Sequence, residues 1–337
     1  MMKSQFWIRL LKPQCQDYQY IQLTTISINT IHLQATDRVY KTILPTLLSL
    51  HLSLSLHFLT HTTMMEGYRI GLTGSAGMLG FILRPHLEAL GATVIGIDKP
   101  TPVSQGGPNL TFQSQGEVDR ECDFSNEESC KNIFEDCTHV IHLAAQGDPN
   151  ANMMTDILPN NIIGMVNATN AAIDAGTVSR FIFASTNHIY HGNTMGLHGQ
   201  GSYCNALADK LGGPGCTKIA HPFAPDSNYA VSKIFGESLG SYLSKIENEF
   251  EFVALRIGWC AYDTPIALEN TIYDEYLKAM FLSKRDFAGY AAAAVTVDLS
   301  KHDGCLSAFA VSDNALCPFD VNESAKLLGY SPLDGFR

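Results

Sequence analysis

The sequence is poor in basic residues. Its 337 residues include 22 lysines and arginines against 33 aspartates and glutamates, which gives a formal net charge of −11. A surface that binds nucleic acid needs a basic patch to neutralise phosphates, and the sequence contains no such cluster. We therefore expect no nucleic-acid partner.

Metal-binding patterns are lacking as well. None of the nine cysteines forms a Cys-x-x-Cys pair, and no cysteine or histidine spacing matches a common metal site. Free thiols in a reducing compartment are the favoured interpretation, and we expect no bound metal. The glycine-rich segment 191–223 holds three histidines and two cysteines at irregular spacing, and we interpret it as a loop that covers a substrate pocket.

The sequence also lacks an uninterrupted apolar run long enough to cross a membrane. Residues 43–59 come nearest, but Pro45, three serines and two histidines break this run, so we expect no membrane partner. Met65 stands shortly before the first recognisable strand. We interpret residues 1–64 as a leader outside the fold and 65–337 as one folded domain. This domain would be cytoplasmic if the chain starts near Met65, while organellar targeting by the leader stays open.

What the sequence does contain is a nucleotide-binding pattern. Residues 68–73 read as a buried strand and 78–90 as an amphipathic helix, and the turn between them has the form Thr-Gly-x-x-Gly-x-x-Gly. Such a turn brings the backbone close to a pyrophosphate, which the N–H groups of the following helix then bind. The residues expected to contact the cofactor here are Gly74, Gly77, Met78, Leu79 and Gly80.

Two carboxylates extend this candidate site. Asp98 ends the second strand of the unit, where it can accept hydrogen bonds from a ribose and would repel a 2′-phosphate, so it favours NAD over NADP. Asp123, followed by Phe124, is a candidate for holding the adenine amino group. Ser125 and Glu128 form a capping-box pattern, which explains the same stretch as the start of a helix, and both interpretations stay open.

Strands alternate with helices along the rest of the core. Buried strands are predicted at 138–145 and 180–186, and a helix is predicted at 160–176. This alternation predicts an α/β fold with a doubly wound parallel sheet of the Rossmann type. In such folds ligands bind at the carboxyl ends of the strands.

Tyr229 and Lys233 lie one helical turn apart on a further predicted helix, so their side chains share a face. Taken alone, such a pair is most often an ordinary surface pair. Here it follows the glycine-rich turn and Thr186, which closes the strand at 180–186. We therefore interpret it as a proton-transfer pair.

In this order, the motifs resemble the extended short-chain dehydrogenase/reductases, the NAD-dependent epimerase/dehydratase family. Further matches are the His-Leu-Ala-Ala segment that ends at Ala145 and the pattern Asn161-x-x-Gly164. The resemblance covers about 66–337. It implies NAD as the cofactor, with further contacts from Leu143, Ala144 and Ala145.

The resemblance also implies catalytic roles. Tyr229 would act as the general acid/base that takes the proton of a substrate hydroxyl while hydride leaves for the nicotinamide. A phenol has a pKa near ~10, so this role requires a depression of roughly 2–3 units, which Lys233 and the cationic nicotinamide would supply. Lys233 would also hold the nicotinamide ribose, Thr186 would orient the reacting oxygen, and Asn161 would support the lysine and the cofactor.

Within the family, stretches such as FASTNHIY and FLSKRDFAG resemble uronate dehydrogenases. That resemblance implies substrate contacts from Asn187 and His188 beside Thr186, and a small C-terminal substrate-binding lobe formed mainly by 191–223 and 259–337. The arginine with which those enzymes grip a carboxylate is absent, and Lys278 is the only basic residue in the corresponding segment. The sequence therefore predicts a sugar or sugar acid without naming it.

The favoured function is an NAD-dependent oxidoreductase that acts on a sugar or sugar acid. A nucleotide-sugar epimerase or dehydratase with transient hydride transfer is one alternative, and a non-catalytic NAD-binding redox sensor is another. The resemblance further implies a homodimer, formed through the helix that carries Tyr229 and the helix that starts near Asn160.

Overall fold

The chain divides into two units, Met1–Thr62 and Thr63–Arg337, in a computed structural model. In the first unit the structure describes only two short antiparallel strands, β1 (Phe6–Arg9) and β2 (Tyr20–Leu23), so the leader expected at 1–64 lies mostly outside the described residues. In the second unit it describes residues 64–99, 116–191, 217–247, 249–260 and 274–336. No helix in these ranges is long and apolar enough to span a membrane.

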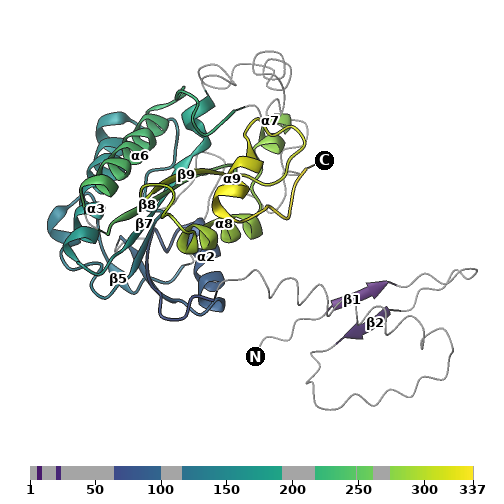
Figure 1. The fold of residues 1–337 in the computed structure, drawn as a ribbon, viewed down its shortest axis with the longest axis horizontal. Coiled ribbons are helices and arrows are strands. Elements are labelled where there is room, and N and C mark those ends of the chain that lie inside the picture. Colours follow the sequence, from purple (N-terminus) through teal and green to yellow (C-terminus); the bar gives the residue numbers. More distant parts are fainter. Residues whose placement is uncertain are drawn as a thin grey trace, which may run out of the picture. The chain divides into compact units, whose positions relative to one another are not determined.

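A parallel sheet of seven strands forms the centre of the second unit as far as it is described (Figure 1). The spatial order is β5-β4-β3-β6-β7-β8-β9, and every neighbouring pair is parallel. The strands are β3 (Arg69–Thr73), β4 (Thr93–Asp98), β5 (Arg120–Glu121), β6 (His139–His142), β7 (Arg180–Thr186), β8 (Glu251–Ile257) and β9 (Cys305–Ala310). The predicted doubly wound sheet is confirmed, and its order reverses between β3 and β6.

Helices cover both faces of this sheet (Figure 1). The helices α2 and α8 pack on one face, and α3 and α6 pack on the other. The helices are α2 (Met78–Ala89), α3 (Gly164–Asp174), α6 (Asn228–Ile246), α7 (Asp274–Ala279), α8 (Lys284–Thr296) and α9 (Val321–Leu328), with the short η1 (Glu127–Cys130) and η3 (Asn187–Tyr190) and the π-helix η2 (Met153–Ile163).

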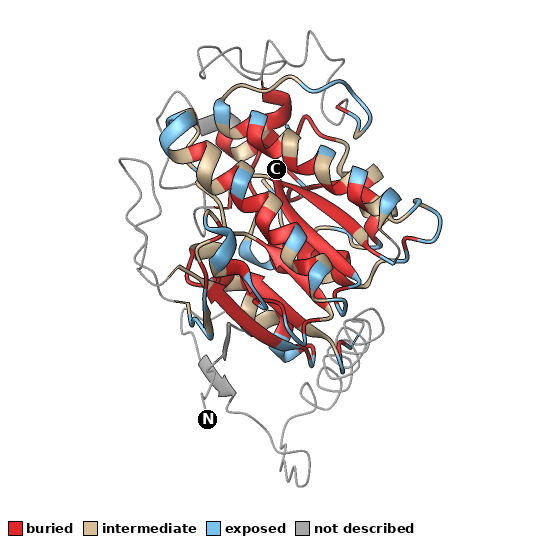
Figure 2. Cartoon of the chain, turned by 90° about the vertical axis from the view of Figure 1, so that its left-hand side faces the viewer, coloured by how far each residue is buried: buried red, intermediate tan, exposed pale blue. Residues whose placement is uncertain are grey.

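The strands are apolar on both sides because both faces are covered. In β8, Val253 and Leu255 belong to the core beneath α2 and α8, while Phe252 and Ala254 belong to the core beneath α3 and α6. Successive side chains of a strand point to opposite faces, so a strand buried on both sides reads as one continuous apolar run. Figure 2 shows these strands buried between partly exposed helices.

Helix α6 lies unusually close to the sheet because two of its residues have no side chain. A Cβ on Gly236 would lie 2.4 Å from the ring of Phe183, and one on Gly240 would lie 2.1 Å from the ring of Phe252. Both rings are buried. These two contacts set the distance between α6 and strands β7 and β8.

Two segments differ from the sequence prediction. The helix expected at 160–176 begins earlier, at Met153, because the Asn152 side chain accepts hydrogen bonds from the first-turn N–H groups and a π-helical pattern accommodates Pro159. Of the region expected to form the substrate lobe, residues 192–216 and 261–273 lie outside the described residues, and described C-terminal elements also contribute to the main fold. Strand β9 completes the main sheet and α8 packs against α2.

We predict that Gly240→Ala lowers the free energy of unfolding by about 1–3 kcal/mol, because the added methyl group must displace a fully buried ring. This cost outweighs the helix-propensity gain of about 1 kcal/mol. Gly147→Ala is the matched control, since nothing lies within 4 Å of a Cβ at that position. Denaturant unfolding of both variants tests this. Equal stabilities for the two variants would contradict the close packing of α6.

Candidate active site

The glycine-rich turn after β3 is built for close backbone approach. Gly74 has φ +70°, and a Cβ there would lie 2.8 Å from the backbone nitrogen of Ala144. A Cβ on Gly80 would lie 2.5 Å from the carbonyl oxygen of Gly74. The Thr73 hydroxyl accepts a hydrogen bond from the Ala144 N–H at 3.2 Å and bonds the His142 ring at 2.9 Å. The turn is therefore held directly against the segment that follows β6.

The start of α2 leaves donors available for an anion. Gly77 is its N-cap, and within the described residues no side chain caps the helix and its first turn contains no acidic residue. The first N–H groups of a helix, together with its dipole, form an anion-binding site when no side chain takes them. Met78 and Leu79, the first two residues of α2, lie at this end.

Asp98 stands at the end of β4, beside the glycine turn. Its carboxylate accepts hydrogen bonds from the backbone N–H groups of Ala76 at 2.9 Å and Lys99 at 2.8 Å. Burial raises the pKa of this carboxyl, and the hydrogen bonds and the Lys99 charge partly oppose the rise. The carboxylate is thus fixed at the carboxyl end of β4, one strand from the switch point of the sheet, where a ribose would lie.

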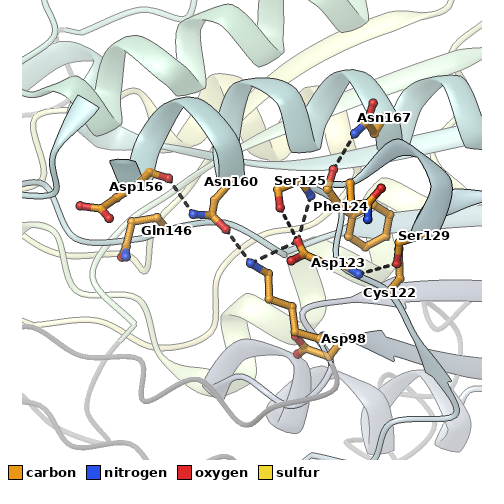
Figure 3. Close-up of polar contacts among 12 residues, drawn as sticks. Asp98, Cys122, Asp123, Phe124, Ser125, Ser129, Gln146, Asp156, Asn160 and Asn167 are labelled. Atoms are coloured by element: carbon orange, nitrogen blue, oxygen red, sulfur yellow. Dashed lines mark hydrogen bonds and ion pairs between the residues drawn. The ribbon is translucent and has the colours of Figure 1, made fainter. Parts of the chain in front are cut away.

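Asp123 occupies the next position along the same edge (Figure 3). Its carboxylate accepts hydrogen bonds from the N–H and hydroxyl of Ser125 and lies 3.2 Å from the Lys99 ammonium, which also donates to Asn160. Although burial opposes ionisation, these hydrogen bonds and this charge lower the pKa of Asp123. The predicted capping box is not formed, since Asn126 rather than Ser125 caps the short helix η1.

Phe124, the other residue predicted near the adenine, is buried. Its ring lies 6.0 Å from that of Phe134 and its carbonyl accepts a hydrogen bond from Asn167 at 2.8 Å (Figure 3). These contacts fix the backbone that presents Asp123.

Tyr229 and Lys233 both point toward the carboxyl end of β7. The Lys233 amine lies 4.8 Å from the centre of the Phe183 ring and 5.6 Å from the centre of the Tyr229 ring. A hydrogen bond joins the side chains of Tyr229 and Thr186. The predicted pair and the strand-end threonine are therefore brought together.

The protonation states differ from the sequence prediction. Burial lowers the pKa of Lys233 to about 7, and in the described part of the chain no acidic group offsets this effect. Burial also raises the pKa of Tyr229 to about 12, with a further rise from the Asp226 carboxylate that the bond to Thr186 only partly opposes. In the chain alone, the expected depression of the phenol pKa is absent, because burial disfavours the phenolate and the buried Lys233 amine is only partly protonated near neutral pH.

Asn161 is linked to the helix that carries Tyr229 and Lys233 through Ser232. Its amide donates to the Ser232 hydroxyl at 2.9 Å and to the Gln146 carbonyl at 3.0 Å, and its oxygen accepts from the Gln146 N–H at 2.7 Å. Ser232 in turn donates to the Tyr229 carbonyl at 2.7 Å. Asn161 thus ties η2, the loop after β6 and α6 together rather than contacting Lys233 itself.

The predicted substrate residues have distinct surroundings. Asn187 is buried and its amide lies 3.4 Å from the Met280 sulfur. His188 is half-buried, its ring 5.8 Å from that of Tyr229 and its Nδ1 bonded to Asp226 at 2.9 Å. Lys278 is half-buried in α7, two residues before Met280.

Sequence reasoning missed Asp226 and His191. The Nδ1 atom of His191 lies 3.1 Å from the same Asp226 oxygen that bonds His188. The only sequence signals were two histidines three residues apart and an acidic residue three positions before Tyr229.

A sequence model of the NAD dependent epimerase/dehydratase family matches residues 70–258, more than half of the chain. The chain belongs to this family. The matched region contains the glycine turn, Asp98, Thr186 and the Tyr229–Lys233 pair.

Individual family members are similar over most of their length. L-arabinose 1-dehydrogenase (NAD(P)(+)) of Haloferax volcanii is 30% identical, over 79% of this chain and 96% of that protein. Glucuronic acid dehydrogenase from Chromohalobacter salexigens is 28% identical with a TM-score of 0.59, over 80% of this chain and 85% of that chain. A mutant uronate dehydrogenase from Agrobacterium tumefaciens in complex with NAD is 26% identical with a TM-score of 0.58, at the same coverage.

The residues present fit the cofactor of this NAD-dependent family. The positions of Gly74 and Gly80 leave no room for a Cβ, so the turn packs directly against the segment after β6 and against the start of α2. The side-chain-free start of α2 suits a pyrophosphate, and the fixed carboxylate of Asp98 suits a ribose.

We predict that the stability gap between the NAD-free wild type and Lys233→Met changes with pH. Between pH 7 and about 10 the folded wild type has released the lysine proton that the unfolded chain still holds, so its free energy of unfolding rises with pH relative to the variant. The slope is at most about 1.4 kcal/mol per pH unit. Urea unfolding at pH 7, 8 and 9 measures it. Lys245→Met, an exposed lysine of the same helix, is the control, and parallel pH curves for wild type and Lys233→Met would contradict a buried, largely neutral amine.

Proposed function

We propose that the protein is an NAD-dependent oxidoreductase that removes hydride from a hydroxyl-bearing carbon of a sugar or sugar acid. The observation that carries this proposal is the grouping of Thr186, Tyr229 and Lys233 at the carboxyl end of β7, in the same parallel sheet whose strands β3 and β4 lead into the glycine turn and Asp98. The similarity to a sugar dehydrogenase and to sugar-acid dehydrogenases supports the substrate class. Asp98 supports NAD in preference to NADP.

In this proposal Tyr229 takes the hydroxyl proton of the substrate. Its hydrogen bond with Thr186 marks the place of the reacting oxygen, since a substrate hydroxyl that entered there would contact both side chains. Bound NAD supplies the hydride acceptor and a positive charge near the phenol. Lys233 has a pKa near the working pH, so it can exchange a proton at its amine as Tyr229 releases or takes one.

We assign substrate selection to the side chains around Thr186, Tyr229 and Lys233. Asn187 and His188 line this group from the start of η3, and Lys278 belongs to the segment that packs on Asn187 through Met280. A lysine offers one compact charge rather than the two parallel hydrogen bonds of an arginine. We therefore infer that carboxylate recognition, where it occurs, is weaker than an arginine would give.

A screen of free aldoses and uronates with NAD, read as NADH formation, tests the function. We expect turnover with at least one such substrate, higher activity with NAD than with NADP, and a loss of about 10²–10⁴-fold in kcat for Tyr229→Phe, because the general base is removed while the ring remains. Tyr242→Phe removes the hydroxyl of an exposed tyrosine on the same helix and is the matched control.

Other outcomes of the same screen discriminate the alternatives. Conversion of a nucleotide-sugar without net NADH favours an epimerase or dehydratase, which the family also contains. NAD binding without turnover of either substrate class, unaltered in Tyr229→Phe, would favour a binding protein and overturn the enzymatic proposal.

We also propose a homodimer formed through α6 and η2, and a cytoplasmic location for the folded unit. The two helices pack side by side, and each exposes large apolar side chains. Those on α6 are Val231, Tyr242 and Ile246, which share one helix face, and those on η2 are Met154 and Ile163.

Light scattering after gel filtration tests the dimer. We expect a dimeric mass for the wild type and a monomeric mass for a Val231→Glu, Tyr242→Glu double variant, because two buried charges in each half of the interface would lack partners. Leu316→Glu introduces a charge at an exposed apolar residue outside these helices and is expected to stay dimeric. A monomeric wild type would rule out this interface.

A further inference from the structure

Three side chains with metal-binding atoms meet beside the Tyr229 ring. His188 and His191 lie three residues apart at η3, and their rings are 4.1 Å apart between centres. Asp226 approaches from the segment before α6, and one of its oxygens lies 2.9 Å from Nδ1 of His188 and 3.1 Å from Nδ1 of His191. The potential ligand atoms of all three residues lie within 4.8 Å of one another.

This spacing suits an ion. Zinc bonds to histidine nitrogen and carboxylate oxygen at about 2.0–2.2 Å, so donor atoms around the ion are separated by roughly 3 Å, as the Asp226 oxygen is from the Nδ1 atoms of His188 and His191. The second carboxylate oxygen of Asp226 accepts a hydrogen bond from the Ser227 hydroxyl at 2.8 Å. Such outer hydrogen bonds orient the ligands of metal sites.

The cluster is reachable from solvent on one side. Asp226 and Ser227 line a cavity of about 400 Å³ together with residues 149–151. His188 and Asp226 keep partial exposure while His191 is buried. Asp226 is therefore the member of the cluster that borders this cavity.

We propose that His188, His191 and Asp226 form a binding site for a divalent transition-metal ion, with zinc best matched to two imidazoles and one carboxylate. The site shares His188 with the proposed substrate contacts but includes none of Thr186, Tyr229 and Lys233, and metal binding can be measured without substrate or NAD. It therefore stands or falls independently of the proposed oxidoreductase activity.

The test uses the full chain after chelator treatment and dialysis, titrated with Zn²⁺ by calorimetry and with Co²⁺ by absorbance. We expect saturation at one ion per chain. The Co²⁺ spectrum should contain ligand-field bands without a sulfur-to-metal charge-transfer band, because none of the three ligands is a cysteine.

Asp226→Asn and His191→Asn are each expected to weaken binding at least 10-fold, and His302→Asn, which changes a half-buried histidine outside the cluster, should bind as the wild type does. Lack of saturable binding by the wild type, a thiolate band, or unchanged affinity in both cluster variants would overturn the proposal. If a cluster variant does not fold, the wild-type stoichiometry and spectrum still decide.

Discussion

A buried ion pair between Arg256 and Glu237 holds together the elements on which the site depends. The guanidinium donates to both carboxylate oxygens, at 3.0 and 2.8 Å, and both side chains are almost fully buried. Arg256 comes from β8 and Glu237 from α6, one helical turn after Lys233. A buried pair of this kind tolerates little displacement, because separating the charges leaves each without solvent or partner.

Arg256 and Glu237 also form hydrogen bonds with residues of β7 and η3. Glu237 accepts a hydrogen bond from the Ser185 hydroxyl at 2.5 Å, and Ser185 directly precedes Thr186 at the end of β7. Arg256 also donates to the Tyr190 hydroxyl at 3.0 Å, and Tyr190 ends η3. The strand end, the helix with Tyr229 and Lys233 and the turn with the histidines are therefore positioned by one network, whose members are all hydrogen-bonded.

Burial determines the pKa values of Tyr229 and Lys233, which this network positions. Gly236 lets α6 approach Phe183 closely, which places the Lys233 amine over an apolar ring. An amine in that position gives up its proton easily, and a phenol beside it keeps its own. In the chain alone the phenol therefore stays protonated, and a bound cationic ring would be the charge that changes the balance.

The sequence by itself determined the fold class, because its main features leave local patterns. A strand buried on both faces reads as a continuous apolar run, as around Val253 and Leu255, and the turn at Gly74 has the glycine spacing of a strand-to-helix connection. It also identified Tyr229 and Lys233, since one helical turn is a local distance. Only the tertiary structure decided that β9 joins the main sheet, that burial lowers the pKa of Lys233, and that Asp226 meets His188 and His191. These features arise between residues tens of positions apart, and burial and long-range contacts depend on how the chain packs rather than on its local pattern.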